Sequence, residues 1–194
     1  MLNLYLDIGG YPMNIDSRTV GICFGRFNPP HKGHKAMWEI ASQFDDYYVG
    51  TNPDTHGQND PLPISVKLLA MQTIMPSITQ HIVITKNLFS LAAGIYAELG
   101  DGIDLYVCTD ENWLTDRLNM YNGIVNTHGF FKFRTIQHVL TPRLATASNL
   151  REAVRIGDRE MFTNEAGISA DTEIELNTRV IKFFDIIEEF LEYD

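Results

Sequence analysis

Two histidines that lie three positions apart, His31 and His34, follow an apolar run and a pair of prolines. On a helix this spacing puts both imidazoles on one face, about 4.5 Å apart along the axis. Gly33 lies between them and leaves room for a phosphate to approach the backbone. The helix N-terminus adds roughly half a positive charge. Together with Arg26, these groups suit a polyphosphate whose α-phosphorus gains charge during a substitution reaction.

Two other interpretations of this segment stay open. It could be an ordinary helix start with two surface histidines, since Pro29 and Pro30 suit a first helical turn. It could also hold zinc, although two histidines with no third ligand nearby make a poor zinc site. The position directly after a strand favours the anion, because ligands of doubly wound folds bind at the carboxyl ends of central strands.

Strand-like and helix-like segments alternate along the chain, which predicts an α/β fold. Short apolar runs predict strands at Thr19–Gly25, Tyr47–Thr51, His81–Thr85, Ile103–Thr109 and Thr135–Leu140. Helical spacing of apolar residues predicts helices at His31–Phe44, Ile64–Met75, Leu88–Leu99, Glu111–Tyr121, Asn149–Ile156 and Ile174–Tyr193. We therefore predict a Rossmann-like, doubly wound parallel sheet of about five strands in the order 3-2-1-4-5, with a helical C-terminal extension.

The 194 residues suit one main domain, predicted at 19–160, with a segment at each end. Residues 1–18 are either an added edge strand, because leucines alternate there, or an accessory tail before a start at Met13. Residues 161–194 form the C-terminal extension, whose acidic helix (Thr172–Asp194) has an apolar stripe. The stripe consists of Ile174, Leu176, Val180, Phe183, Phe184, Ile187 and Leu191. This helix packs on the domain or forms the interface of a homo-oligomer.

The composition limits the class of protein. No apolar run reaches the roughly 18 residues of a membrane span, and the segment Met1–Arg18 has no secretory signal. A net charge of −10 disfavours general attraction to nucleic acid or an anionic membrane. Cys23 and Cys108 lie in apolar runs, so we expect buried, reduced thiols in a cytoplasmic protein. Any anionic ligand must then be held by a local cluster of positive groups.

A resemblance to a known superfamily is carried by the string Gly25-Arg26-Phe27-Asn28-Pro29-Pro30-His31-Lys32-Gly33-His34. It resembles the signature of the H-x-G-H nucleotidylyltransferases, above all the nicotinamide-mononucleotide adenylyltransferase branch and the cytidylyltransferase-like proteins of phages and bacteria. The resemblance extends from about Thr19 to Asp158. It implies that His31 and His34 act on the triphosphate and the transition state. It also implies a nucleotide site that includes Gly25, Arg26, Phe27, Asn28 and Gly33.

The superfamily's other signature is a Ser-[Ser/Gly/Ala]-Thr-x-[Ile/Leu/Met]-Arg turn that opens a later helix. Thr146-Ala147-Ser148-Asn149-Leu150-Arg151 stands in that place, with the two hydroxyl residues exchanged. We expect Ser148 to be the N-cap and Arg151 to reach the same anion with several donors. The resemblance assigns Thr146 and Ser148 to the nucleotide and gives Arg151 a catalytic role. The alternative is an ordinary capped helix with an exposed arginine.

Val107-Cys108-Thr109-Asp110 ends the fourth predicted strand, where the superfamily has Gly-Ser-Asp. The resemblance implies that Asp110 binds the nucleoside. In the order 3-2-1-4-5 the first and fourth strands flank the switch point, which places Asp110 beside His31. Asp110 could also cap the following helix. Cys108 replaces glycine and Glu111 stands where many relatives have arginine, so the choice of base stays open.

The polar loop Asn52–Pro63 is long enough to suggest a function, and it resembles the superfamily's Asn-Pro-Leu region. Candidates to bind the acceptor phosphate are Asn52, Lys67, Lys86 and Arg143. A solvated surface residue is the alternative for each of them.

The resemblance implies in-line attack by an acceptor phosphate oxygen on the α-phosphorus, with pyrophosphate leaving. Mg²⁺ would be held mainly by triphosphate oxygens and water, with no protein ligand. The expected partners are a nucleoside triphosphate and a small phosphomonoester, with ATP and nicotinamide mononucleotide as the first candidates. CTP with a phosphorylated alcohol or sugar is the alternative, and a non-catalytic nucleotide-binding protein is a third. The short acidic chain, without a Lys-Met-Ser-Lys-Ser signature, argues against a class I aminoacyl-tRNA synthetase.

Overall fold

The computed structural model describes residues 18–53, 60–176 and 178–191. The predicted N-terminal edge strand or tail therefore lies outside the described residues, apart from Arg18. The middle of the predicted acceptor loop, residues 54–59, lies outside them as well.

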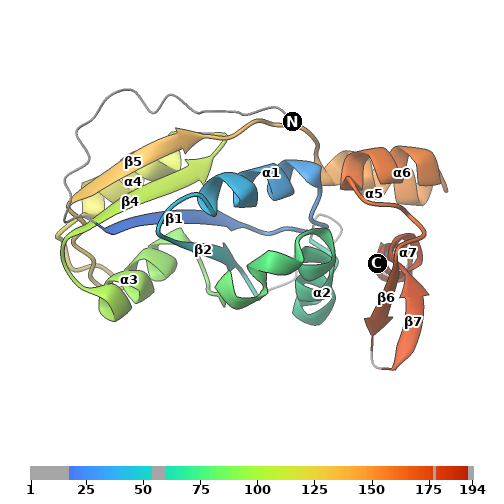
Figure 1. Cartoon of the computed structure of the whole chain (residues 1–194), viewed down its shortest axis with the longest axis horizontal. Coiled ribbons are helices and arrows are strands. Elements are labelled where there is room, and N and C mark those ends of the chain that lie inside the picture. The colour runs from blue at the N-terminus through green and yellow to red at the C-terminus, as the bar shows by residue number, and fades with distance from the viewer. Residues whose placement is uncertain (1–17, 54–59, 177, 192–194) are drawn as a thin grey trace.

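The chain forms an α/β fold around one parallel sheet (Figure 1). Its strands are β1 (Arg18–Gly25), β2 (Asp46–Thr51), β3 (Ile82–Ile84), β4 (Ile103–Thr109) and β5 (Thr135–Leu140). They pair in the order β3-β2-β1-β4-β5, and every pair is parallel. The predicted Rossmann-like strand order is thus confirmed. The reversal of direction lies between β1 and β4, which puts the ligand end of the sheet at the ends of these two strands.

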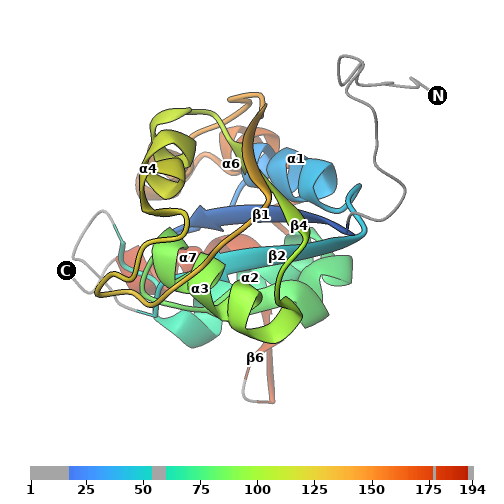
Figure 2. The same ribbon diagram turned by 90° about the vertical axis from the view of Figure 1, so that its left-hand side faces the viewer.

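The helices form layers on both faces of the sheet. They are α1 (Lys32–Ala41), α2 (Ile64–Ile74), the 3₁₀ turn η2 (Pro76–His81), α3 (Leu88–Leu99), α4 (Trp113–Tyr121), α5 (Ala147–Arg155), α6 (Arg159–Ala166) and α7 (Phe183–Leu191). α1 and α2 share one hydrophobic cluster, whereas α3, α4 and the aromatic segment before β5 share another. Figure 2 shows α1 and α4 on opposite sides of β4. Alternating strand residues supply the two faces, because successive side chains of a strand point in opposite directions.

The C-terminal part differs from the single long helix predicted there. The helix α6 was not predicted, and a hairpin of β6 (Glu173–Leu176) and β7 (Arg179–Lys182) precedes the short helix α7. The predicted stripe is compatible with both structures, because Ile174 and Leu176 also alternate with acidic residues at the period of a strand. Val180, placed in the stripe, is exposed on β7.

The C-terminal elements pack against the rest of the molecule. Phe162 of α6 packs edge-on against Phe183 and Phe184 at the start of α7. These rings belong to the same buried cluster as Trp38 of α1 and Met71 of α2. Figure 1 shows α5, α6, α7 and the hairpin grouped beyond the carboxyl end of the sheet.

Two smaller expectations can also be compared with the structure. Cys23 and Cys108 are buried free cysteines, as predicted. None of the helices in the described ranges combines the length and the hydrophobicity needed to cross a membrane.

Candidate active site

A cavity of about 320 Å³ opens at the carboxyl ends of β1, β4 and β5. The first turns of α1 and α5 border it, so two helix N-termini with their partial positive charge face the same space. Its lining residues are Phe24, Gly25, Arg26, Phe27, Asn28, His31, Gly33, His34, Met37, Thr109, Asp110, Thr141, Pro142, Arg143, Ala145, Thr146, Ala147, Ser148 and Arg151. The two sequence motifs, more than a hundred residues apart, therefore meet in one cavity.

The cavity brings together all the residues predicted for catalysis and nucleotide binding, and Arg143 from the predicted acceptor group. Asn52, Lys67 and Lys86 do not line it. The sequence interpretation missed Thr109 and Thr141, which line the cavity where β4 and β5 end. Thr109 ends one apolar strand and Thr141 directly follows another, which was the available signal. The Thr141 N–H donates to the Thr109 carbonyl at 3.1 Å, which continues the strand pairing to the rim of the cavity.

His31 and His34 form a stacked pair at the start of α1. Their ring centroids are 3.6 Å apart and their planes differ by 20°. The backbone N–H of His31 donates to Nδ1 of His34 at 3.2 Å. This bond requires Nδ1 without a proton, so we assign the proton of the neutral His34 ring to Nε2. Nδ1 of His31 is buried and has no hydrogen-bond partner among the described residues.

Both imidazoles are held in the neutral form. Burial, reinforced by the charges of Lys32 and Arg143, lowers the pKa of His31 to about 4. Burial and the neighbouring His31 lower the pKa of His34 well below its usual value. Near pH 7 the pair can therefore donate or accept hydrogen bonds, and an approaching anion would raise both pKa values.

Acid should destabilise the ligand-free protein through these rings. Because folding lowers the pKa of His31, the unfolded chain binds a proton below pH 6.5 that the folded chain does not. This contribution to stability is present above pH 6.5 and is lost as the pH falls. At pH 5 the loss from His31 should be on the order of 2 kcal/mol. Urea unfolding at pH 7.5 and pH 5 should show a smaller drop for His31→Gln than for the wild type. Equal drops would contradict the assignment.

Phe27 supports the histidine pair from inside the molecule. Its ring packs edge-on against His34 at 4.8 Å and against Trp38 at 5.3 Å. Its backbone φ of 50° lies in the left-handed region. A Cβ on Gly25 would lie 2.6 Å from the Phe27 ring, so only glycine fits there. The predicted nucleotide residues Gly25 and Phe27 thus set the position of His34 as well as lining the cavity.

Gly33 brings the two halves of the site close together. A Cβ at this position would lie 3.2 Å from the His31 ring and 3.4 Å from the backbone nitrogen of Ala145. The first distance is tight and the second is a van der Waals contact, so a side chain here would press on the His31 ring and touch the segment before α5. The predicted room for a phosphate is thus partly used by the protein itself.

The side chain of Asn28 is fully engaged with the segment before α2. Its Nδ2 donates to Asp60 and to the Leu62 carbonyl, and its Oδ1 accepts from the Leu62 N–H at 2.9 Å. The backbone carbonyl of Asn28 accepts from Nη1 of Arg151 at 2.7 Å. Asn28 therefore joins three parts of the chain, and its amide is not directed at a nucleotide in this arrangement.

Arg151 lies inside the site and is only 6% exposed. Besides the bond to Asn28, its Nη2 donates to the hydroxyl of Ser148 at 3.3 Å. Burial, followed by the positive charges of Arg155 and Arg26, lowers its pKa, while Asp60 acts in the opposite direction. The alternative of an ordinary helix with an exposed arginine is thereby wrong.

The N-cap of α5 is Thr146, not Ser148 as predicted. The helix begins at Ala147, and the hydroxyl of Thr146 accepts from the Asn149 N–H at 3.1 Å. The N–H of Thr146 donates to Glu165 of α6 at 3.3 Å. Ser148 lies within the first turn, where its hydroxyl faces Arg151. Thr146 and Ser148 therefore both line the cavity, with Thr146 as the cap.

Asp110 and Arg143 lie at the mouth of the cavity. Arg143 Nε lies 4.0 Å from Asp110 Oδ2, and the Arg143 side chain is 70% exposed. Asp110 does not cap α4, since the residue before that helix is Asn112. A shallow groove continues outward from this mouth along Glu111 and Leu140.

The remaining acceptor candidates lie elsewhere. Lys67 is completely buried, and its Nζ donates to the carbonyl of Asn52 at 3.1 Å. The expectation that Lys67 reaches an acceptor phosphate, or is a solvated surface lysine, does not agree with this position. Lys86 is exposed and lies outside the cavity. In the described ranges, no three His, Cys, Asp or Glu side chains gather as a metal site.

Neither a protein-family model nor a curated protein matches the chain. Among solved structures, the fold is similar to that of a proposed nicotinate-nucleotide adenylyltransferase from Vibrio parahaemolyticus. The TM-score is 0.48 and the identity 13%, over 88% of this chain and 91% of that one. At this distance the similarity assigns no activity, so the function must be argued from the cavity and its residues.

Proposed function

We propose that this protein is a nucleotidylyltransferase, which transfers a nucleotidyl group from a nucleoside triphosphate to a phosphate-bearing small molecule. The observation that carries the proposal is the stacked pair of His31 and His34, which line one cavity together with Arg151 and the first turns of α1 and α5. Neutral imidazoles, a buried guanidinium and helix N-termini stabilise a polyphosphate that gains charge in the transition state.

The histidines are suited to the α-phosphate of the transferred nucleotidyl group. With its Nδ1 occupied by the His31 N–H, His34 can donate from Nε2 to an oxygen of the α-phosphate. A phosphate oxygen would also supply the missing partner of His31 Nδ1, whose burial without one is costly. As negative charge builds up on the oxygens of the α-phosphate in the transition state, these hydrogen bonds become stronger.

The other positive groups are suited to the leaving pyrophosphate. Arg151 and Ser148 lie on the α5 side of the cavity, and Arg26 is exposed at its rim. The acceptor oxygen forms the new bond to the α-phosphorus as the bond to the β-phosphate oxygen breaks, and no covalent enzyme intermediate is required. Bound Mg²⁺ would neutralise triphosphate charge, held mainly by phosphate oxygens and water. The enzyme's own contribution is positioning and charge stabilisation.

The first candidate reaction is adenylyl transfer from ATP to nicotinamide mononucleotide, because the Arg-Phe-Asn-Pro-Pro form of the first motif resembles that branch. A cytidylyltransferase that uses CTP and a phosphorylated alcohol or sugar would use the same triphosphate residues. The groove beside Asp110 and Glu111, where this chain departs from the superfamily's pattern, is where base choice would differ. A non-catalytic nucleotide-binding protein is the third candidate, although it has no need of two neutral histidines.

A screen of the four nucleoside triphosphates against a panel of phosphomonoesters, nicotinamide mononucleotide included, tests the proposal. Pyrophosphate release should require Mg²⁺, one preferred triphosphate and one acceptor. Release without an acceptor would indicate hydrolysis. Tight triphosphate binding with no turnover for any pair would favour the non-catalytic alternative.

A further inference from the structure

A fully buried lysine lies close to the candidate site without entering it. Lys67 of α2 has no exposed surface, and its Nζ lies 3.1 Å from the Asn52 carbonyl and 3.5 Å from Asp60 Oδ1. Burying an ammonium group is costly unless the charge is paired and hydrogen-bonded. An apolar side chain at this position of α2 would avoid the free-energy cost of burying a charge. The presence of a lysine therefore suggests that its charge has a role.

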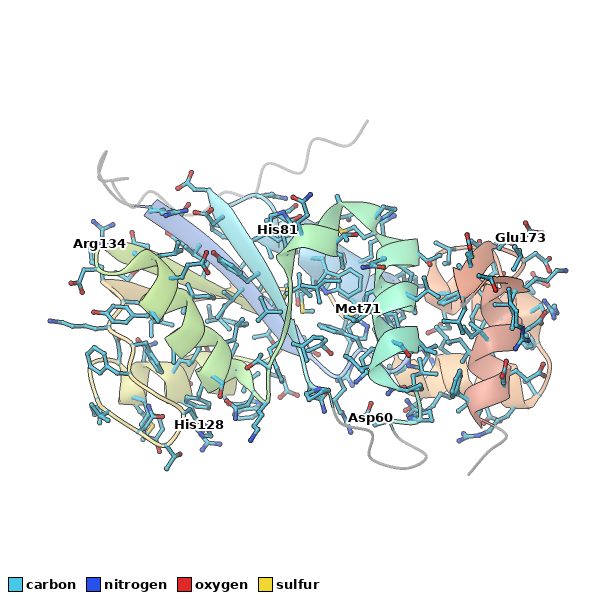
Figure 3. The ribbon with its side chains drawn as sticks, turned by 90° about the horizontal axis from the view of Figure 1, so that it is seen from below. Asp60, Met71, His81, His128, Arg134 and Glu173 are labelled. Atoms are coloured by element: carbon cyan, nitrogen blue, oxygen red, sulfur yellow. The ribbon has the colours of Figure 1, made fainter. Side chains whose placement is uncertain are left out.

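Asp60 connects this lysine to the cavity. Its carboxylate is also completely buried, just before α2 (Figure 3). Its Oδ1 accepts from the amide of Asn28, and its Oδ2 is buried without a hydrogen-bond partner among the described residues. The negative charge of Asp60 therefore depends on nearby cations for compensation.

Asn28 contacts both Asp60 and Arg151. While its amide holds Asp60, its backbone carbonyl accepts the 2.7 Å hydrogen bond from Arg151 Nη1. The negative charge of Asp60 also acts on Arg151 directly, because it raises the pKa that burial lowers. A chain of contacts thus runs from α2 to the guanidinium on α5, and the charge of the buried carboxylate acts on both Lys67 and Arg151.

We infer that Lys67 is a positioning residue that holds Arg151 against the triphosphate through Asp60 and Asn28, and that it does not itself bind the acceptor. This inference rests on the proposed function only in the test that measures nucleotide binding. With Lys67 present, the charge of Asp60 is compensated on the α2 side, and Arg151 keeps its position at the cavity. Without it, Asp60 attracts Arg151 away from the phosphates.

The first test is nucleotide affinity, measured by calorimetry with the preferred triphosphate and without any acceptor. Lys67→Met should weaken binding about 10-fold, the size of a typical coupling between linked sites. Lys67→Met/Asp60→Asn should regain most of the affinity, since no unpaired charge remains. Lys35→Met, at an exposed lysine paired with Glu39, is the matched control and should bind normally. An unchanged affinity in Lys67→Met, with only the acceptor KM raised, would show direct acceptor binding and overturn the inference.

A second measurement does not depend on the function. In the ligand-free protein, two cations that share one buried carboxylate should be coupled. The melting temperature of Lys67→Met/Arg151→Met should therefore fall by more than the sum of the two single shifts. Additive shifts would contradict the link even if nucleotide binds. If the wild type binds no triphosphate, the proposed function fails. The melting temperatures of the two single variants and the double variant still decide whether Lys67 and Arg151 are coupled.

Lys67→Met removes the cation that pairs with Asp60 and leaves this carboxylate buried, which can prevent folding. The double variant with Asp60→Asn then replaces it, and it should fold and bind nucleotide with near wild-type affinity. A double variant that folds but does not bind would contradict the inference, since it would show a direct need for the lysine.

Discussion

Replacing His34 by alanine should reduce the rate of pyrophosphate release about 10²- to 10³-fold, the usual effect of removing one donor to a transition state. The expected loss is mainly in kcat, because the hydrogen bond from Nε2 strengthens as charge develops on the oxygens of the α-phosphate. The backbone N–H of His31 would also lose its acceptor on His34, so the first turn of α1 should loosen. Steady-state kinetics with the preferred pair of substrates measures both kcat and KM.

His128→Ala is the matched control for this prediction. His128, labelled in Figure 3, is also stacked on an aromatic ring, that of Phe89, but it is exposed and does not line the cavity. Its loss should leave the rate unchanged. Undiminished release in His34→Ala would remove the histidine pair from the mechanism. His34→Gln should recover part of the rate, since an amide can still donate a hydrogen bond.

Arg151→Met should weaken triphosphate binding and lower kcat/KM by an even larger factor, because the variant loses the charge and also leaves two acceptors unpaired. The Asn28 carbonyl and the Ser148 hydroxyl both face the guanidinium at present. Arg151→Lys should keep the charge and lose one contact, with a cost of about 10- to 100-fold. Nucleotide calorimetry and steady-state kinetics separate the binding loss from the rate loss.

Arg155→Met is the control on the same helix. This arginine is half-exposed and lies 3.9 Å from Glu152, one turn away on the surface. Such exposed pairs contribute little, so both affinity and rate should stay close to the wild type. If Arg151→Lys behaves like the wild type, the two hydrogen bonds of the guanidinium to Asn28 and Ser148 have no role, and only the positive charge matters.

Much of the scaffold follows from local patterns in the sequence. The strands β4 and β5 and the helix α3 have the predicted bounds. Their apolar periodicity and the glycine after α3 depend on neighbouring residues only. The C-terminal hairpin was missed because a stripe such as Ile174, Leu176 and Val180 fits two periods, and pairing between β6 and β7 decides between them.

The candidate site, like the fold, could be predicted only in part from the sequence. The place of His31 and His34 after the first strand predicted an anion site there, and the resemblance of Thr146–Arg151 to a superfamily signature predicted that Arg151 would join it. Only the tertiary structure decided that His31 is buried, that the pKa values of both imidazoles are lowered, that Thr146 caps α5, and that Lys67 is internal. The physical reason is that burial, pKa and hydrogen-bond partners depend on groups distant in sequence. Asn28 meets Asp60 across 32 positions and Arg151 across 123, and no local pattern contains such contacts.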